Sequence, residues 1–309
     1  MDRLEAMSVV VAVAETGSFS AASRRLRTPV ARVSRKVAEL ETRLRTEVFQ
    51  RTSRRIALTD AGLSYIAACR RILEQVEDAE QEASGEYTTP KGDLSVTAPW
   101  GLGHMHLMPL ALQFLETHPE IALRLALTDR VINPIEEDID VSIRIGPLPD
   151  SSMIASHIGS VRLVTCASPS YLAAYGTPMT PNDLGNHQCI TVDGAMTPTS
   201  WQFSGVKQTM VVPIRSRLCV NTSEAAIQAA IAGAGLTRVM SYKMEDAKIS
   251  GALSIVLDAF EPEPLPVHIV YPQRKLMPLK LRAFITWITP RIKLRLTSQL
   301  SGAPKRAKI

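Results

Sequence analysis

The chain has 309 residues, a net charge of +5 and a hydrophobic content of 45%. The length allows two or more domains, and the modest total charge argues against a protein that coats nucleic acid without specificity. No uninterrupted apolar run approaches a membrane span and no signal-peptide pattern is present, so we expect a soluble, cytoplasmic protein with no membrane partner.

The first sixty residues carry the pattern of a helix-turn-helix. A first amphipathic helix is predicted to end at Gly17, and Ser18 is a suitable cap for a short second helix. Thr28 is a good N-cap and Pro29 suits the first position of a third helix. The predicted buried positions are Leu4, Met7, Val11 and Ala14 in the first helix and Val33, Val37, Leu40 and Leu44 in the third.

Positive charge is concentrated around the third helix. Between Arg24 and Arg55 there are eleven Lys and Arg residues against three Glu, a local net charge of +8. We expect Arg32, Arg35 and Lys36 to face outward. A helix that buries one face and presents small, polar and basic residues at its N-terminus is typical of a recognition helix in the DNA major groove. The alternative is a helix whose basic face is merely solvated, but the confined charge favours DNA.

A short two-stranded wing is predicted after the third helix. Phe49 precedes the arginine-rich segment 51–55, and residues 56–59 then alternate briefly between apolar and other side chains. Arginines at the tip of a wing can reach phosphates or the narrow minor groove. An ordinary exposed turn is the alternative.

A long helix is predicted over residues 60–86, where the local net charge is −5. Its apolar stripe could pack on its own domain or pair two chains as a coiled coil. The length without Gly or Pro between Leu63 and Ala83 favours the pairing of chains. The members of the stripe are Leu63, Ile66, Cys69, Leu73, Val76 and Ala83.

Strands and helices alternate after a boundary at residues 84–92, which indicates an α/β fold with a largely parallel sheet. The remaining roughly 220 residues fit two similar subdomains joined by crossing strands better than one unit. Strands are predicted at 94–97, 121–127, 139–145, 163–166, 236–240 and 267–271, and helices at 102–117, 223–232 and 279–294.

Ligands of α/β proteins bind beyond the carboxyl ends of strands, so we expect a small carboxylate to bind at three such ends. The alternatives are helix capping for Asn221 and Ser223, a structural ion pair for Arg144 and simple packing for Trp100. The candidate effector-binding residues are Thr97, Ala98, Pro99, Trp100, Thr128, Arg144, Asn221, Thr222 and Ser223.

Other reactive residues give weaker signals. His104 and His106 lack a third ligand nearby in the sequence, so we expect no metal. Burial as small apolar residues is the default for the four cysteines, although Cys166 and Cys219 near strand ends leave a thiol redox switch possible. No GxSxG, HExxH, GxGxxG or P-loop pattern occurs, so we expect neither catalysis nor a cofactor. The basic tail 301–309 is expected to be disordered.

Two groups of residues carry a resemblance to a known family. In the N-terminal part they are Ala21-Ala22, Leu26, Val33-Ser34-Arg35, Leu40-Glu41, Leu44, Phe49, Arg51-Thr52, Leu58-Thr59 and Ala61-Gly62. Further along they are Val96-Thr97-Ala98-Pro99, Gly103, Asp140, Ile143-Arg144-Ile145-Gly146, Cys166-Ala167-Ser168-Pro169, Tyr171-Leu172, Gly233-Ala234-Gly235-Leu236 and Pro264-Leu265-Pro266-Val267-His268. In these residues the chain resembles the LysR-type transcriptional regulators of bacteria, along about 290 residues.

The resemblance implies an α+β multidomain protein. It implies a winged helix-turn-helix over 1–59, a linker helix and hinge over 60–90 that pairs two subunits, and an effector-binding domain over 91–300. The effector domain would be periplasmic-binding-protein-like, with two Rossmann-like subdomains, one formed by 91–161 and 268–300 and the other by 162–267. The expected partners are a small-molecule effector, further copies of the chain as a dimer or dimer of dimers, and double-stranded DNA with an inverted repeat, with RNA polymerase as a further candidate. The expected location is the nucleoid of a bacterial cytoplasm.

By the same resemblance, Pro29, Val30 and Arg32 would contact base edges, Ser34 and Arg35 would hold the DNA backbone, and Arg54 would probe the minor groove. Family members commonly have Ala at the position of Arg32. The full set of candidate DNA-binding residues is Ser18, Thr28, Pro29, Val30, Ala31, Arg32, Ser34, Arg35, Lys36, Arg51, Thr52, Ser53, Arg54 and Arg55.

We therefore interpret the sequence as a DNA-binding transcriptional regulator whose activity is modulated by a small carboxylate or aromatic effector. The alternative is a ligand-binding or enzymatic α/β protein with an incidental basic helical extension.

Overall fold

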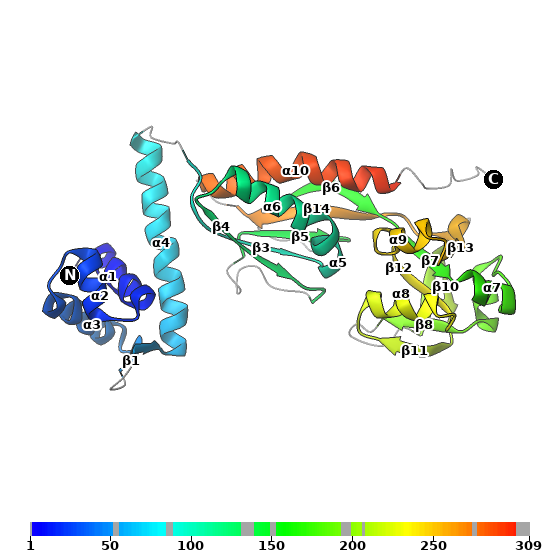
Figure 1. The fold of residues 1–309 in the computed structure, drawn as a ribbon, viewed down its shortest axis with the longest axis horizontal. Coiled ribbons are helices and arrows are strands. Elements are labelled where there is room, and N and C mark those ends of the chain that lie inside the picture. Colours follow the sequence, from blue (N-terminus) through cyan, green and yellow to red (C-terminus); the bar gives the residue numbers. More distant parts are fainter. Residues whose placement is uncertain are drawn as a thin grey trace. The chain divides into compact units, whose positions relative to one another are not determined.

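The computed structural model describes residues 2–51, 56–84, 89–130, 139–148, 153–192, 199–205, 208–273 and 277–300. The chain divides into two compact units, Met1–Thr89 and Pro90–Ile309 (Figure 1). In the part of the chain that the structure describes, no helix is both long enough and apolar enough to cross a membrane.

The first unit is a winged helix-turn-helix followed by a long helix. Its elements are α1 (Arg3–Thr16), α2 (Phe19–Leu26), α3 (Val30–Leu44), β1 (Phe49–Arg51), β2 (Ile56–Leu58) and α4 (Asp60–Ser84). The strands pair antiparallel, with Phe49 opposite Leu58. Gly17 ends α1 in the left-handed conformation, and Ser18 caps α2 by accepting a hydrogen bond from the Ala21 N–H at 3.4 Å. These boundaries confirm the predicted element order.

The predicted apolar face of α1 is partly wrong. Leu4 is exposed, and Met7, Val11 and Ala14 are only half-buried. Helix α1 contacts α2, α3 and α4, and it is apolar around most of its circumference, so periodicity alone could not identify its most buried side. The buried residues are Ala6, Val9, Val10, Ala12 and Val13.

The predicted start of α3 is also shifted by one residue. Pro29 is the N-cap and the helix begins at Val30, with no side-chain cap. The Thr28 hydroxyl instead donates to the Leu26 carbonyl at 3.1 Å. Arg27 adopts a left-handed conformation with φ 49° as it closes α2, so the turn between the helices consists of Arg27, Thr28 and Pro29. Val33, Val37 and Leu40 are buried as predicted, whereas Leu44 is exposed.

Helix α4 packs part of its apolar stripe within its own unit. Ile66 and Cys69 belong to the core, but Leu63 is 57% exposed, against the prediction. Leu73 and Val76 are half-buried, and the side chain of Ala83 lies outside the described residues. The stripe is thus divided between an inner part that packs against the unit and an outer part open to solvent.

Among its described residues the second unit contains two five-stranded sheets. In the first, β4 (Ile121–Leu127), β3 (Gly92–Ala98), β5 (Val141–Ile145), β14 (Leu265–Pro272) and β6 (Met153–Val161) lie in that order. In the second, the order is β11 (Ser216–Val220), β8 (Cys189–Val192), β12 (Leu236–Met240), β7 (Leu163–Ala167) and β13 (Ser254–Val256).

The prediction of largely parallel sheets is wrong for about half of the strand pairs. Strands β3, β4 and β5 run parallel, as do β8, β11 and β12. Strand β14 is antiparallel to both β5 and β6, and β7 is antiparallel to both β12 and β13. An antiparallel pair that the sequence did not predict, β9 (Ser200–Ser204) with β10 (Thr209–Pro213), lies beside the second sheet.

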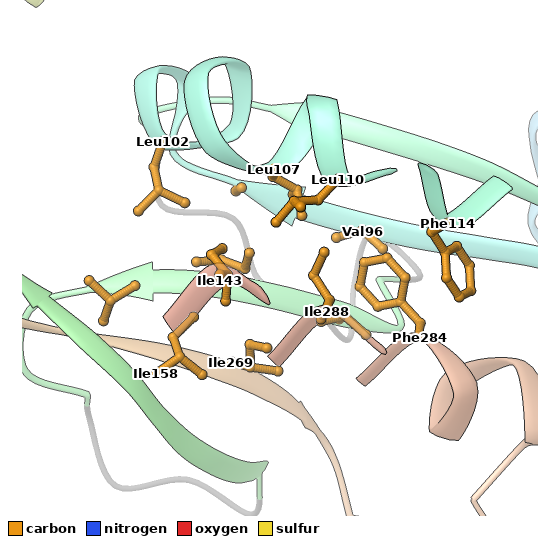
Figure 2. Packing of buried hydrophobic residues seen from close by; sticks show 14 of the residues in the cluster. Val96, Leu102, Leu107, Leu110, Phe114, Ile143, Ile158, Ile269, Phe284 and Ile288 are labelled. Atoms are coloured by element: carbon orange, nitrogen blue, oxygen red, sulfur yellow. The ribbon is translucent and has the colours of Figure 1, made fainter. Parts of the chain in front are cut away.

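Helices cover the hydrophobic faces of the sheets. The first sheet packs against a π-helix (Gly103–Leu107), α6 (Met108–Thr117) and α10 (Leu279–Leu300), which lie on the same core as Ile143 and Ile269 (Figure 2). Phe114 and Phe284 meet edge-to-face at 5.1 Å. The remaining helices are α5 (Trp100–Leu102), α7 (Pro169–Tyr175), α8 (Ser223–Ile231) and α9 (Glu245–Ile249), with 3₁₀ turns at Pro181–Asn186, Ser241–Met244 and Asp258–Phe260.

The chain passes between the two sheets twice, first between β6 and β7 and later between the 3₁₀ turn Asp258–Phe260 and β14. Arg162 lies on the first crossing and Glu261 on the second. Buried Arg162 and half-buried Glu261 form a bidentate ion pair, Nε to Oε2 at 2.8 Å and Nη2 to Oε1 at 2.7 Å. This pair fastens the two crossings together.

Gly62 permits the start of α4 to approach the strand β1. The Thr59 hydroxyl accepts from the Gly62 N–H at 2.8 Å, and a Cβ at Gly62 would overlap the Val48 carbonyl oxygen. We expect Gly62→Ala to destabilise the first unit by about 1–3 kcal/mol, because the backbone at Val48 must move to make room for the added methyl group. Gly185→Ala, where a Cβ would meet open space, should change stability by less than about 0.5 kcal/mol. Urea unfolding of both variants tests this; equal midpoints would contradict the packing account.

The second unit should lose stability as the pH falls below about 6.5. Burial lowers the pKa of His106, His187 and His268 below their ordinary 6.5, so the unfolded chain binds more protons than the native state in this range. His106 is buried against the ring of Tyr242. Thermal unfolding between pH 7.5 and about 5 should therefore show a smaller drop for His106→Leu than for the wild type. An identical drop would contradict the role of His106, and exposed His104→Leu is the control.

Candidate DNA-binding surface and effector pocket

The first turn of α3 is exposed within the first unit. Pro29, Val30, Ala31 and Arg32 are all exposed, and Val30 is 43% exposed although it is apolar. The next turns bury Val33, Val37 and Leu40, which hold the helix against α1 and α2. Ser34 is half-buried and Arg35 is exposed, with its Nε 3.7 Å from Glu39 Oε1. The N-terminal end of α3 is therefore exposed, as the sequence predicted.

Lys36 does not face outward, which corrects the sequence prediction. Its side chain is 10% exposed and its ammonium pairs with the Glu5 carboxylate of α1. Position 36 lies beside the buried Val33 and Val37 on the helix, so α1 covers it. Arg32, one turn earlier, also approaches Glu5, with Nη2 3.6 Å from Oε1. The Glu5 carboxylate thus lies beside two of the predicted DNA-binding cations, Arg32 and Lys36.

The wing is connected to α3 through Glu41. Its carboxylate accepts from the N–H groups of Val48 and Phe49 at 2.9 and 3.0 Å. These bonds set the position of β1 relative to the recognition helix. The predicted wing-tip residues Thr52, Ser53, Arg54 and Arg55 and the side chain of Arg51 lie outside the described residues.

A cavity of about 370 Å³ lies between the two sheets of the second unit. Of the predicted effector-binding residues, Thr97, Ala98, Pro99, Thr128, Arg144 and Ser223 line it. Sequence reasoning missed Asp129, Arg130, Ile143, Ile145, Val192, Met240, Tyr242, Lys243 and Leu265. Asp129 and Arg130 directly follow Thr128, and Lys243 follows the predicted strand 236–240, so the rule that located the other strand ends could have found these three.

Three predicted residues do not line the cavity. Trp100 is 45% exposed and stacks on His104 at 5.8 Å. Thr222 caps α8 by accepting from the Ala225 N–H at 3.2 Å, and Asn221 is exposed. Capping is thus performed by Thr222, whereas Ser223 turns toward the cavity. Among the lining residues, the Thr97 hydroxyl already donates to the Ala126 carbonyl at 2.9 Å.

Lys243 is the central cation of the cavity. Its side chain is 6% exposed, and its ammonium donates to Ser223 Oγ at 3.1 Å. It also lies 3.5 Å from Glu224 Oε1 and 3.8 Å from Asp129 Oδ2. Asp129 follows β4 of the first sheet, and Ser223 and Glu224 begin α8 beside the second. The ammonium therefore joins groups from both sides of the cavity.

The remaining candidate reactive residues are two histidines and three cysteines, and most of them pack against neighbouring side chains. His104 stacks on Trp100 and His106 meets Tyr242 edge to face, and within the described residues no three potential metal ligands cluster. Burial raises the pKa of Cys166 and of Cys189 to about 12, so both remain thiols at neutral pH. Cys219 is exposed on β11, with β8 and β12 lying between it and β7, which carries Cys166. That separation exceeds the reach of a disulfide.

Comparison with known proteins gives matches along nearly the whole chain. Residues 4–63 match the family model described as bacterial regulatory helix-turn-helix protein, lysR family, and residues 88–293 match the LysR substrate binding domain. An HTH-type transcriptional repressor from Pseudomonas aeruginosa is 33% identical, with 93% of this chain and 92% of that protein covered. The transcriptional activator AaeR of Escherichia coli is 31% identical, with 94% of each covered.

Solved structures agree with these matches. The LysR-type regulator CrgA from Neisseria meningitidis is similar with a TM-score of 0.60 and 30% identity, covering 93% of this chain and 98% of that one. The alternative of an enzyme with an incidental basic extension is therefore wrong. The chain belongs to the LysR family of bacterial transcriptional regulators and combines a helix-turn-helix DNA-binding domain with a domain that binds a small-molecule effector.

Proposed function

We propose that two copies of the chain bind an inverted-repeat operator through the first turn of α3 and the wing, and that a small carboxylate in the cavity changes this binding. The observation that carries the proposal is the cavity of about 370 Å³ lined by Arg130, Arg144 and Lys243. It accompanies a helix whose exposed N-terminus suits the DNA major groove.

On the DNA side, exposure divides the candidate residues by role. Val30 offers an apolar contact for a thymine methyl group, and Arg32 offers N–H donors for a guanine. Ser34 and Arg35 lie further along the helix, where they would contact phosphates. Residues 51–55 of the wing are proposed to contact phosphates or the minor groove.

On the dimer side, α4 offers an outer apolar stripe. Leu63 and Ile72 are exposed and Leu73 and Val76 are half-buried, whereas the first unit's own core takes Ile66. Pairing this stripe with a second copy would bury it, and a two-fold dimer would present two recognition helices to two symmetric half-sites. A dimer of dimers and a contact with RNA polymerase are extensions of this proposal.

On the effector side, the cavity combines cations with apolar walls. The lining residues include three cations and one carboxylate, Asp129, and this balance of charge favours an anion. Met240, Tyr242 and Val192 provide apolar surface for a hydrocarbon or aromatic body. A ligand carboxylate would take the place of Asp129 or Glu224 beside Lys243. The two sheets are proposed as the two subdomains, near the boundaries predicted from sequence.

Base reading and phosphate contact can be separated by two variants. Arg32→Ala should change the preferred sequence and reduce discrimination by about 1–3 kcal/mol, whereas Arg35→Ala should weaken binding to all duplexes alike. Selection from a random duplex library, followed by titrations with the enriched and a scrambled duplex, measures both effects. If the two variants weakened both duplexes equally, Arg32 would have no base-reading role.

Effector binding should depend on Lys243. A panel of small carboxylates is screened by thermal shift, and affinity for a stabilising compound is then measured by calorimetry. Lys243→Met should weaken that affinity at least about tenfold, because a charged hydrogen bond contributes about 1.5–3 kcal/mol. Exposed Lys248→Met is the matched control and should bind as the wild type does. Unchanged affinity in Lys243→Met would contradict the proposed anchor.

A further inference from the structure

We propose that Glu5, a residue of α1 outside the recognition helix, determines how specifically α3 reads DNA by holding the Arg32 guanidinium in place. In this role Glu5 is a positioning residue: it keeps Arg32 available for a base edge and discourages it from binding phosphates at random. The inference rests on the proposed function only in taking Arg32 as a base-reading residue.

The geometry places one carboxylate over two successive turns of α3. Arg32 and Lys36 are four residues apart, so their side chains leave the helix on the same face. Glu5 Oε2 pairs with the Lys36 ammonium, and Glu5 Oε1 lies 3.6 Å from Arg32 Nη2. Each oxygen of the carboxylate therefore faces a different cation.

Lys36 anchors the carboxylate. The Lys36 side chain is 10% exposed, and a buried ammonium is strongly destabilising unless a counter-charge stays beside it. Glu5 is therefore held by Lys36 even though its own side chain is 45% exposed. Because one oxygen is fixed, the other remains beside Arg32, which keeps a partner at the edge of the exposed surface.

Two consequences follow for Arg32. Its guanidinium loses rotamer freedom before DNA arrives, while the N–H donors that face away from Glu5 stay available for the paired acceptors of a guanine. The Glu5 carboxylate also repels phosphate oxygens, so a shift of Arg32 to the DNA backbone would separate an existing ion pair. Both effects favour a base contact over a phosphate contact.

Arg35 provides a contrast on the same helix. It lies 3.7 Å from Glu39, with the two side chains 72% and 50% exposed, and within the described residues no buried cation pairs with Glu39. The Arg32 side chain is itself 56% exposed, so the two pairs differ in the Lys36 anchor of Glu5 and not in the burial of the arginine. Exposed pairs of this kind separate readily and contribute little. Arg35 can therefore leave Glu39 for a phosphate, whereas Arg32 is restrained.

Glu15 provides the matched control. It is the other carboxylate of α1 that bridges two cations, with Oε2 2.6 Å from Arg25 Nη1 and Oε1 3.4 Å from Arg70 Nε. Those cations belong to α2 and α4 and not to α3. Glu5→Gln and Glu15→Gln remove the same charge from the same helix, so general effects of charge and folding are shared by both variants.

The experiment compares the wild type with Glu5→Gln, Glu15→Gln, Arg32→Ala and the double variant Glu5→Gln/Arg32→Ala in the full chain. The DNA probes are the duplex that the wild type enriches from a random library and a scrambled duplex of the same length, each titrated at several salt concentrations. Glu5→Gln should lower the ratio of the two affinities about fivefold or more. On scrambled DNA its log–log salt dependence should steepen by about 0.9, the value for one additional phosphate contact.

Glu15→Gln should leave the affinity ratio unchanged, and Glu5→Gln should have no further effect on the ratio when Arg32 is already Ala. Two further variants test the anchor. Lys36→Met should relax the ratio in part, because it frees the Glu5 carboxylate without removing it, and Glu5→Gln/Lys36→Met should relax the ratio as far as Glu5→Gln does. An unchanged ratio in Glu5→Gln, or an equal loss with and without Arg32, would overturn the inference. If the wild type enriched no sequence, the base-reading role of α3 would fail as well.

Discussion

The ion pair between Arg162 and Glu261 is the constraint on which the second unit depends. The Arg162 side chain is 6% exposed and that of Glu261 12% exposed, and two parallel hydrogen bonds fix the guanidinium against the carboxylate. The backbone of Arg162 also accepts from the Ser241 N–H at 2.8 Å, where β12 passes into the turn that carries Lys243. Because the cavity walls come from both sheets, its shape depends on how these crossings are held. A buried pair of this kind contributes defined geometry more than net stability.

Similar pairing of buried cations recurs at both functional regions. Lys36 is anchored to Glu5 in the first unit, and Lys243 lies among Ser223, Glu224 and Asp129 in the second. In each case a cation that would suit an anionic ligand already has a partner from another element. At Lys243 the binding of an anionic ligand would then be an exchange of partners, whereas in the first unit the Lys36–Glu5 pair would stay in place and direct Arg32.

The sequence predicted the elements whose signals are local. Gly17 and Ser18 mark a helix end and a helix start through their own backbone and side-chain chemistry, and alternating residues in 121–127 predicted β4 within one residue. Thr97, Thr128 and Ser223 were placed at the cavity because strand ends converge there, and Arg144 because its cation could pair with an effector carboxylate. Trp100 was misplaced because a helix begins at that residue and directs its ring toward His104.

Features set by distant partners could not be predicted in this way. The outward direction assigned to Lys36 failed because Glu5 and the packing of α1 decide its environment. The antiparallel strands β12 and β7 are separated by about seventy residues in the sequence, and neither segment carries a local signal that identifies its neighbouring strand. The charge of +8 around α3 likewise gives no information on which arginines are already paired.

The central claim is that a ligand bound beside Lys243 alters DNA binding by the same chain. The most direct test is the affinity of the full-length protein for its enriched duplex, with and without a carboxylate that stabilises it. The account predicts that the ligand changes the wild-type affinity several-fold and leaves the affinity of Lys243→Met unchanged. A wild-type protein that binds the ligand in this cavity and shows the same DNA affinity in its presence and absence would contradict it.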